Sequence, residues 1–133
     1  MLACWVLAMA VAADEMIAPG VHVLDGAVNT GAIVRDGHAL LIDCCDTVTP
    51  ERLAAIGVSD VERILCTQFR RTHNAGMYPF AVRGAKIIVP KTEQSLFESA
   101  EAHWNDWSNR WHLYRARPGP LVPARSVKVT RGV

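Results

Sequence analysis

The sequence predicts an α/β layered domain. Short aliphatic runs typical of buried strands alternate with segments that carry helix-capping residues and helical spacing. The length of 133 residues, half of them hydrophobic, suits one globular domain or part of a larger one. Fourteen basic residues against thirteen acidic ones give no electrostatic reason to expect binding to nucleic acid or to an anionic membrane.

The first thirteen residues have the pattern of a secretory signal peptide. Residues 1–13 are an apolar run that ends in small residues, followed by Asp14 and Glu15, although no Lys or Arg precedes the run. The run is shorter than the roughly 20 apolar residues that a membrane-spanning helix needs. We therefore expect cleavage near Ala12 or Ala13, export to the periplasm or the extracellular space, and no stable membrane insertion. A buried amino-terminal strand or helix is the alternative.

Three cysteines would remain in the exported chain, namely Cys44, Cys45 and Cys66. An odd number leaves at least one free thiol or an intermolecular bridge. Adjacent cysteines bond to each other only with strain, so Cys66 would be the better disulfide partner for either of the other two. Alternatively, all three are small residues that fill the ends of strands. No C-x-x-C spacing supports a metal site made of these thiols.

The amino-terminal half of the domain is predicted to be a run of strands. Asp36-Gly37 favours a two-residue turn and has apolar runs on both sides. His38, beside this turn, has no partner at the spacing of metal ligands. Strands are expected at residues 20–24, 32–35 and 39–43, with a turn at 26–31.

A short helix is predicted to follow these strands. Thr49 can cap it, Pro50 suits the first helical position, and Gly57 can end it. Leu53 and Ile56 give this helix an apolar side.

The carboxyl-terminal part is predicted to contain a long helix between two strands. Residues 85–89 are a compact strand stopped by Pro90, and residues 127–129 alternate apolar and basic. Thr92 can cap a helix that runs to about Trp111. Its apolar stripe, which is expected to face the core rather than a sugar or a partner, consists of Phe97, Ala100, Trp104, Trp107 and Trp111. His103 and His112 lie off the stripe and are expected to face solvent.

The segment ILCTQFRRTHNAG, residues 64–76, contains the candidate site. A short strand ends at Thr67 in a polar turn, and a helical turn or two is expected between Gly76 and about Phe80. A strand that ends in a polar turn before a helix is a common place for a metal or anion site.

The order of these elements resembles the first half of the metallo-β-lactamase fold superfamily. This resemblance implies part of an αββα sandwich, a mixed sheet with covering helices. It covers about residues 20–133, and we expect the carboxyl-terminal half of the fold to be missing, as in a fragment. The matching residues are Asn29, Leu41-Ile42-Asp43, Thr67, His73, Gly76 and Ile87-Ile88-Val89-Pro90.

The family motif T-H-x-H-x-D-H-x-x-G can be placed in one register, because His73 and Gly76 match its last His and its Gly. In this register Gln68 stands at the first His, Arg70 at the second His and Thr72 at the Asp. The resemblance implies that the first two histidines, with a later one, hold one zinc ion in the family. It also implies that the Asp helps to hold a second ion and orients the attacking hydroxide.

These replacements argue against the chemistry of the family. A glutamine is a poor zinc ligand, and a guanidinium group is not a ligand at all. The charge of Arg70 beside a divalent cation would add a repulsion on the order of 4 kcal/mol at an effective dielectric of about 20. We therefore expect a hydrolase-like protein with a degraded zinc motif, without metallohydrolase activity in this form, and with no cofactor.

One alternative is a non-catalytic binding module. Gln68, Arg70 and Arg71 are hydrogen-bond donors, and with the amides that open the next helix they would suit a small-molecule or anionic ligand. A purely structural interpretation is that Arg70 pairs with Asp43 or Asp46 and stabilises the turn.

Another alternative is that the protein is an active hydrolase with an atypical mononuclear metal site around His73. Zinc would then be possible, with Cys44, Cys45, Cys66 or residues of the missing half as further ligands. Cys44 or Cys66 paired with His73 is also conceivable as a nucleophile. No G-x-S-x-G elbow or Gly-rich phosphate loop is present in the sequence. The substrate and the oligomeric state cannot be predicted from these residues.

Overall fold

The computed structural model describes residues 14–109 and 124–133. Its strands are β1 (Glu15–Ala18), β2 (Val21–Leu24), β3 (Thr30–Arg35), β4 (His38–Ile42), β5 (Asp60–Leu65), β6 (Lys86–Val89) and β7 (Arg131–Gly132). Its helices are α1 (Pro50–Ala55), α2 (Arg71–Asn74), α3 (Tyr78–Ala81), the 3-10 helix η1 (Lys91–Glu93), α4 (Gln94–Glu98) and α5 (Ala100–Asn105).

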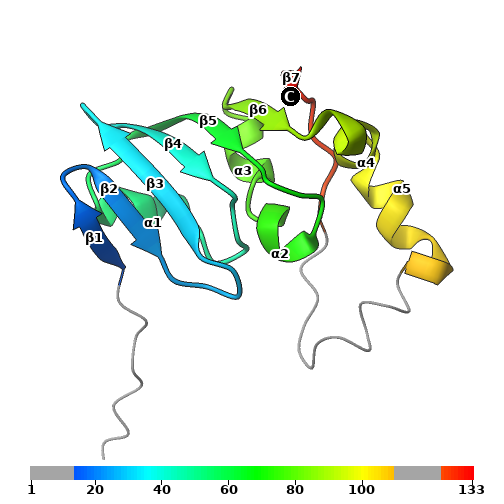
Figure 1. Cartoon of the computed structure of the whole chain (residues 1–133), viewed down its shortest axis with the longest axis horizontal. Coiled ribbons are helices and arrows are strands. Elements are labelled where there is room, and N and C mark those ends of the chain that lie inside the picture. The colour runs from blue at the N-terminus through cyan, green and yellow to red at the C-terminus, as the bar shows by residue number, and fades with distance from the viewer. Residues whose placement is uncertain (1–13, 110–123) are drawn as a thin grey trace, which may run out of the picture.

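The strands form one seven-stranded sheet whose spatial order equals their order in the chain, β1 to β7 (Figure 1). Neighbouring strands from β1 to β4 are antiparallel, whereas β4, β5, β6 and β7 are parallel. This mixed sheet with its helices confirms the predicted α/β class. Strand β1 follows directly on the predicted signal segment and was not predicted.

The hairpin between β3 and β4 forms at the predicted dipeptide. Asp36 and Gly37 have φ angles of 50° and 79°, and two positive values in a two-residue loop are typical of a type I′ turn. Strand β3 begins earlier than predicted, because Thr30 is buried and pairs with Leu24 of β2.

Helix α1 also forms where it was predicted. The hydroxyl of Thr49 accepts a hydrogen bond from the amide of Arg52 at 3.2 Å, so the side chain caps the helix. The chain leaves the helix through Gly57, whose φ of 87° suits glycine. Leu53 is buried and fixes the helix on the sheet.

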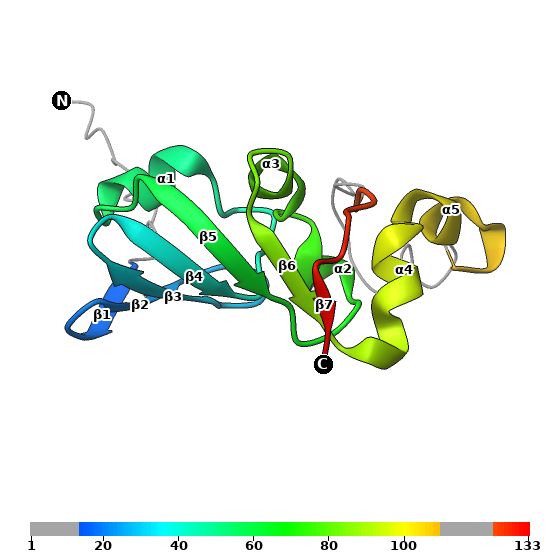
Figure 2. The ribbon, with the colours of Figure 1, turned by 90° about the horizontal axis from the view of Figure 1, so that it is seen from above.

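Helices α1 and α3 lie on the same side of the sheet (Figure 2). The inward-facing strand residues Leu41, Ile64 and Ile87 are fully buried together with Leu53 and Phe80 of these helices. The hydrophobic core of the described residues therefore lies between the helical layer and one face of the sheet.

The opposite face of the sheet has no described helix over it (Figure 2). Ile33 and Ile42 lie on this face, and they are 46% and 37% exposed. An exposed apolar sheet face agrees with one half of a two-sheet sandwich.

The predicted helix from Thr92 to Trp111 is wrong as one continuous element. It is divided into η1, α4 and α5, with a break at Ser99. In a continuous helix the amide of Glu101 would donate to the carbonyl of Phe97. That carbonyl instead accepts from the amide of Val127 at 3.1 Å, and the amide of Glu101 donates to Ser126 Oγ at 3.4 Å.

The predicted strand at residues 127–129 is also wrong, because this segment bonds to the helical region. The alternation did predict burial correctly, because Val127 and Val129 are buried and Lys128 is exposed. The amide of Val127 nevertheless bonds to a helix, and the segment reaches the sheet only at Thr130, which donates to the carbonyl of Ile87 at 2.8 Å. Strand β7 follows as the last strand beside β6.

The predicted signal peptide, residues 1–13, lies outside the described residues, and so do Trp111 and His112. Cleavage and export therefore remain predictions. Of the helices in the described part, none is long and apolar enough to cross a membrane.

Candidate functional site

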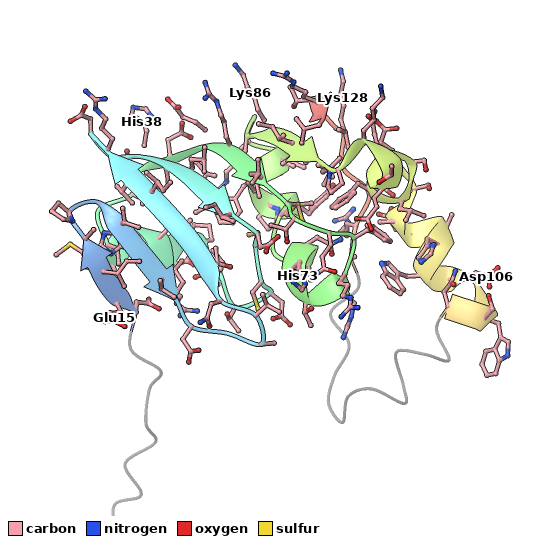
Figure 3. All side chains as sticks on the ribbon, in the orientation of Figure 1. Glu15, His38, His73, Lys86, Asp106 and Lys128 are labelled. Carbon is pink, nitrogen blue, oxygen red and sulfur yellow. The ribbon has the colours of Figure 1, made fainter. Side chains whose placement is uncertain are left out.

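The candidate site lies in the two loops that follow β4 and β5. Because these strands are parallel, their carboxyl ends bring the two loops together at one edge of the sheet. The amide of Asp43 donates to the carbonyl of Leu65 at 2.8 Å, which joins the loops where they begin. Figure 3 shows His73 on the second loop, far from His38 and Lys86, which lie where β4 and β6 begin.

Asp43 holds the first residue of the second loop. Its buried carboxylate accepts from the amide of Thr67 at 2.8 Å and from the hydroxyl of Thr67 at 2.9 and 3.0 Å. The backbone of Asp43 has a φ of 59°, in the left-handed region that Asp tolerates better than most residues. A buried carboxylate that receives such bonds makes Asp43 a positioning residue for the loop.

The other end of the loop is fixed on the backbone after β4. The amide of Cys44 donates to the carbonyl of His73 at 2.7 Å, and the amide of Gly76 donates to the carbonyl of Cys44 at 3.0 Å. A Cβ atom at position 76 would lie only 2.1 Å from the carbonyl oxygen of Cys45. Glycine is therefore required at position 76 by this close approach of two backbone segments.

His73 is held at both ring nitrogens. Its Nε2 lies 2.9 Å from Gln68 Nε2, and its Nδ1 lies 3.1 Å from the hydroxyl of Thr72. With the amide nitrogen of Gln68 facing the ring, Nε2 accepts and Nδ1–H donates to Thr72. Turning the carboxamide over would reverse both roles and would leave both nitrogens engaged. The structure thus brings together three of the predicted site residues.

The two arginines of the loop differ in environment. Arg70 is exposed at the start of α2, whereas Arg71 is buried. Within the described residues, no ion pair joins Arg70 to Asp43 or to Asp46. The predicted pairing of Arg70 with Asp43 or Asp46 is therefore wrong: the carboxylate of Asp43 receives Thr67, and that of Asp46 receives the thiol of Cys45. Only Arg70 of the pair presents its side chain to solvent.

The three described cysteines are buried free thiols, so no disulfide links Cys66 to Cys44 or Cys45. Burial raises the pKa of the Cys44 thiol far above its ordinary value, and the neighbouring thiols Cys66 and Cys45 raise it further. Burial also raises the pKa of Cys66, and the charge of Asp43 adds to this effect. A nucleophilic cysteine needs a lowered pKa, so these thiols do not suit that role.

The donor set of the loop does not fit a zinc ion. In the part of the chain that the structure describes, no three His, Cys, Asp or Glu side chains are grouped so that they could hold a metal ion. The residues in the motif positions are a carboxamide, a guanidinium and a hydroxyl, and a catalytic zinc site needs three imidazole, thiolate or carboxylate ligands. The single imidazole of the loop already has a hydrogen-bond partner at each nitrogen.

No role was predicted for Phe69, whose side chain fixes the loop on the core. Its buried ring stacks on Trp104 at a centroid distance of 5.5 Å and meets Phe97 edge-on at 5.0 Å. His103 was expected to face solvent, but it is half-buried, edge-on to Phe69 at 5.2 Å. The amide of Phe69 also donates to the carboxylate of Glu93. A lone aromatic residue in a polar loop was the signal available in the sequence.

Comparisons with known proteins agree with this geometry. A Cronobacter sakazakii metallo-β-lactamase with a HARLDQ motif superposes with a TM-score of 0.65 at 16% identity, over 90% of this chain and 46% of that one. The subclass B3 metallo-β-lactamase BJP-1 of Bradyrhizobium japonicum gives a TM-score of 0.64 at 16% identity, over 86% of this chain and 42% of that one. The chain has about half of the metallo-β-lactamase fold.

The match to the metallo-β-lactamase fold is partial. The metallo-β-lactamase SMB-1 also matches, with a TM-score of 0.56 at 14% identity, over 83% of this chain and 43% of that one. This chain therefore spans about half the length of the solved structures that it matches. No family model matches the sequence, and no curated protein matches it either. At these identities the similarity shows the fold alone.

Proposed function

We propose that this metallo-β-lactamase-fold chain has a degraded zinc motif and is not an active metallohydrolase in this form. The proposal is carried by one observation, the pair of hydrogen bonds that engages both nitrogens of His73. The partners are Gln68 and Thr72, two of the residues that stand in ligand positions of the family motif. A ring in this arrangement must give up a hydrogen bond before it can bind a metal ion.

The charge of the loop supports the same proposal. Arg70 stands in the position of the second motif histidine and keeps its positive charge at any physiological pH. A divalent cation placed in the loop would therefore be repelled rather than bound by this side chain.

A second candidate is an atypical mononuclear metal site around His73. One specific observation favours it: the Cronobacter sakazakii enzyme is a metallo-β-lactamase described by the motif HARLDQ. Placed letter for letter on residues 68–73, QFRRTH, this motif has an arginine at the position of Arg70. An arginine at that position therefore does not by itself decide against metal. The arginine is the one residue that the two segments share. At positions 68, 72 and 73 the motif has His, Asp and Gln, where this chain has Gln68, Thr72 and His73.

Metal analysis of the purified full chain tests the proposal. We expect zinc far below one equivalent per chain after dialysis against micromolar zinc, and no change in the His73→Ala variant. One zinc per chain that is lost in His73→Ala would overturn the proposal and establish the second candidate.

A triple variant is the positive control for this measurement. Gln68→His, Arg70→His and Thr72→Asp together restore the family motif on the same backbone. We expect this variant to retain more zinc than the natural chain, because imidazole and carboxylate replace the three unsuitable groups.

The same purified protein also tests the alternative that the chain is a non-catalytic binding module. It predicts that inorganic phosphate raises the thermal unfolding temperature of the natural chain and has no effect on Arg70→Ala, since Arg70 is the exposed arginine of the loop. An equal response of both proteins would exclude Arg70 as the anion-binding group.

A further inference from the structure

Two adjoining cavities lie at the end of the sheet where β5 and β6 begin, away from the His73 loop (Figure 3). The smaller, of about 60 Å³, is lined by side chains of α1, β5 and α3, and the larger, of about 280 Å³, by the first residues of β5 and β6. Asp60, Val61 and Arg83 line both cavities, so the two form one groove with Arg83 at the junction. We call it the β5–β6 groove.

The strand register creates the larger cavity. Strand β6 pairs with β5 only from Arg63 onward, so residues 60–62 have no strand beside them on that side. A register shift between Ala39 and Leu40 of β4 gives β5 an extra residue at the same place. Such a bulge twists a strand locally and often accompanies a binding site. A Cβ atom added at Gly84 would meet no heavy atom within 4 Å, so the groove is open there.

The mouth of the groove carries three cations, of which Arg83 also acts electrostatically on the carboxylate of Glu51 in α1. In the described part of the chain, no ion pair involves Arg63, Arg83 or Lys86. The groove also contains two acidic residues, Asp60 and Glu62, whose carboxylate oxygens lie 3.5 and 3.6 Å from Nδ1 of His38.

The small cavity offers an apolar surface behind these cations. Its walls include Leu53, Val58, Val61 and Phe80, which are all buried residues of the core. Arg83 stands between this apolar end and the cationic mouth. The groove therefore combines an apolar end with an end where cations outnumber carboxylates by three to two.

We propose that the β5–β6 groove binds a small monocarboxylate with a short unbranched chain. The carboxylate accepts hydrogen bonds from Arg83 and Lys86, and the chain lies in the small cavity. A volume of about 60 Å³ has room for roughly four groups of water size, at about 15 Å³ for each, which corresponds to a chain of about four carbons beyond the carboxylate. This site is independent of the metal question, because it lies at the other end of the strands.

A series of carboxylates titrated into the full chain, followed by NMR, tests the proposal. The probes are acetate, propionate, butyrate, pentanoate, hexanoate and heptanoate. We expect the affinity to rise about three- to fourfold for each added methylene up to about pentanoate, and then to level off. The amide resonances of Val61 and Gly84 should shift. Affinities that do not depend on chain length would overturn the proposal.

Charge variants supply the second part of the test. Arg83→Gln should weaken pentanoate binding at least tenfold, whereas Arg35→Gln, which removes an exposed arginine outside the groove, should leave it unchanged. Asp60→Asn should tighten binding, because it removes a negative charge beside the ligand. An equal effect of Arg83→Gln and Arg35→Gln would show that pentanoate responds only to the overall surface charge, and it would overturn the proposal. Lys86→Gln is the second variant should Arg83→Gln fail to fold.

Discussion

At the scale of single residues, Asp43 and Thr67 decide where the candidate loop begins. The carboxylate of Asp43 receives both the amide and the hydroxyl of Thr67, at 2.8 to 3.0 Å. A resemblance to a family motif assigns these two residues to a site. It does not say that they bond to each other, because hydrogen bonds between distant residues depend on how the strands are arranged.

Removing the hydroxyl of Thr67 tests this bond. We expect Thr67→Val to lower the free energy of unfolding by about 1.5–3 kcal/mol, since a buried carboxylate loses a hydrogen bond to its charge. Thr67→Ser should recover most of the loss. Thr92→Val, at an exposed threonine, is the matched control and should change stability by less than about 0.5 kcal/mol. Chemical denaturation measures all three, and equal effects at both threonines would contradict the role of Asp43.

The thiols give a second prediction at this scale. Burial raises the pKa of Cys44 and Cys66, so the folded chain keeps both protons at pH 8. We expect alkylation of these two thiols at pH 8 to be at least about a hundredfold slower in the native chain than in denaturant, as mapped by mass spectrometry.

The same thiols make the folded chain less stable at alkaline pH. Their folded pKa is above the unfolded value of about 8.5, so the stabilisation is complete below that pH and is lost as the pH rises. A free energy of unfolding that stays constant from pH 8 to 10 would contradict this assignment.

At the scale of elements, the structures that depend on local signals were predictable, and the break in the long helix was not. The Thr49 cap and the Asp36-Gly37 turn depend on neighbouring residues, and both formed as predicted. The helix after Thr92 has the right spacing, yet Val127 takes the Phe97 carbonyl on which its continuation depends. The periodicity of a helical segment cannot reveal that a residue 30 positions further along the chain takes one of its carbonyl groups.

The loop between β5 and α3 is the element that most needs one particular residue. Gly76→Ala would bring a Cβ atom to 2.1 Å from the carbonyl oxygen of Cys45, and we expect a loss of more than about 3 kcal/mol in the free energy of unfolding. Gly57→Ala is the control: its position has open space, and its positive φ alone should be worth about 1 kcal/mol. Similar losses at both glycines would show that the close approach at Gly76 is relieved by a small shift.

At the scale of the whole molecule, Arg52 joins segments that are distant in sequence. Its guanidinium donates to the carboxylate of Asp14, to the carbonyl of Asp25 at 2.8 Å and to the hydroxyl of Thr47 at 3.1 Å. The start of β1, the loop after β2 and the segment before α1 are thereby held together. The sequence did not reveal this contact, since its partners lie up to 38 residues apart.

This contact predicts a dependence of stability on pH. Hydrogen bonds from Arg52 hold the pKa of Asp14 below its usual value, so the stabilisation is present above about pH 4 and is lost as the pH falls through the lowered pKa. We expect the free energy of unfolding of the natural chain to fall more steeply between pH 5 and 3 than that of Asp14→Asn. Asp36→Asn, at a highly exposed carboxylate, is the control and should follow the natural chain. Parallel curves for all three would contradict the prediction.

The fold as a whole was predictable because its evidence is spread along the chain. His73 and Gly76 fixed the register of the family motif, and the described sheet and the solved structures agree with the fold that this resemblance implies. The bonds inside the site were not predictable, because Gln68 and Thr72 could be recognised only as unsuitable ligands. Their second role, as hydrogen-bond partners of His73, became visible only in the folded loop.

The central claim is that the ring of His73 is engaged at both nitrogens and does not act as a zinc ligand. Nitrogen-15 NMR of the imidazole side chains tests it most directly, with His73→Gln to assign the signal. We expect the His73 nitrogen signals to stay unchanged when one equivalent of zinc is added at pH 8. A stoichiometric shift of the His73 nitrogens on addition of zinc would contradict the account.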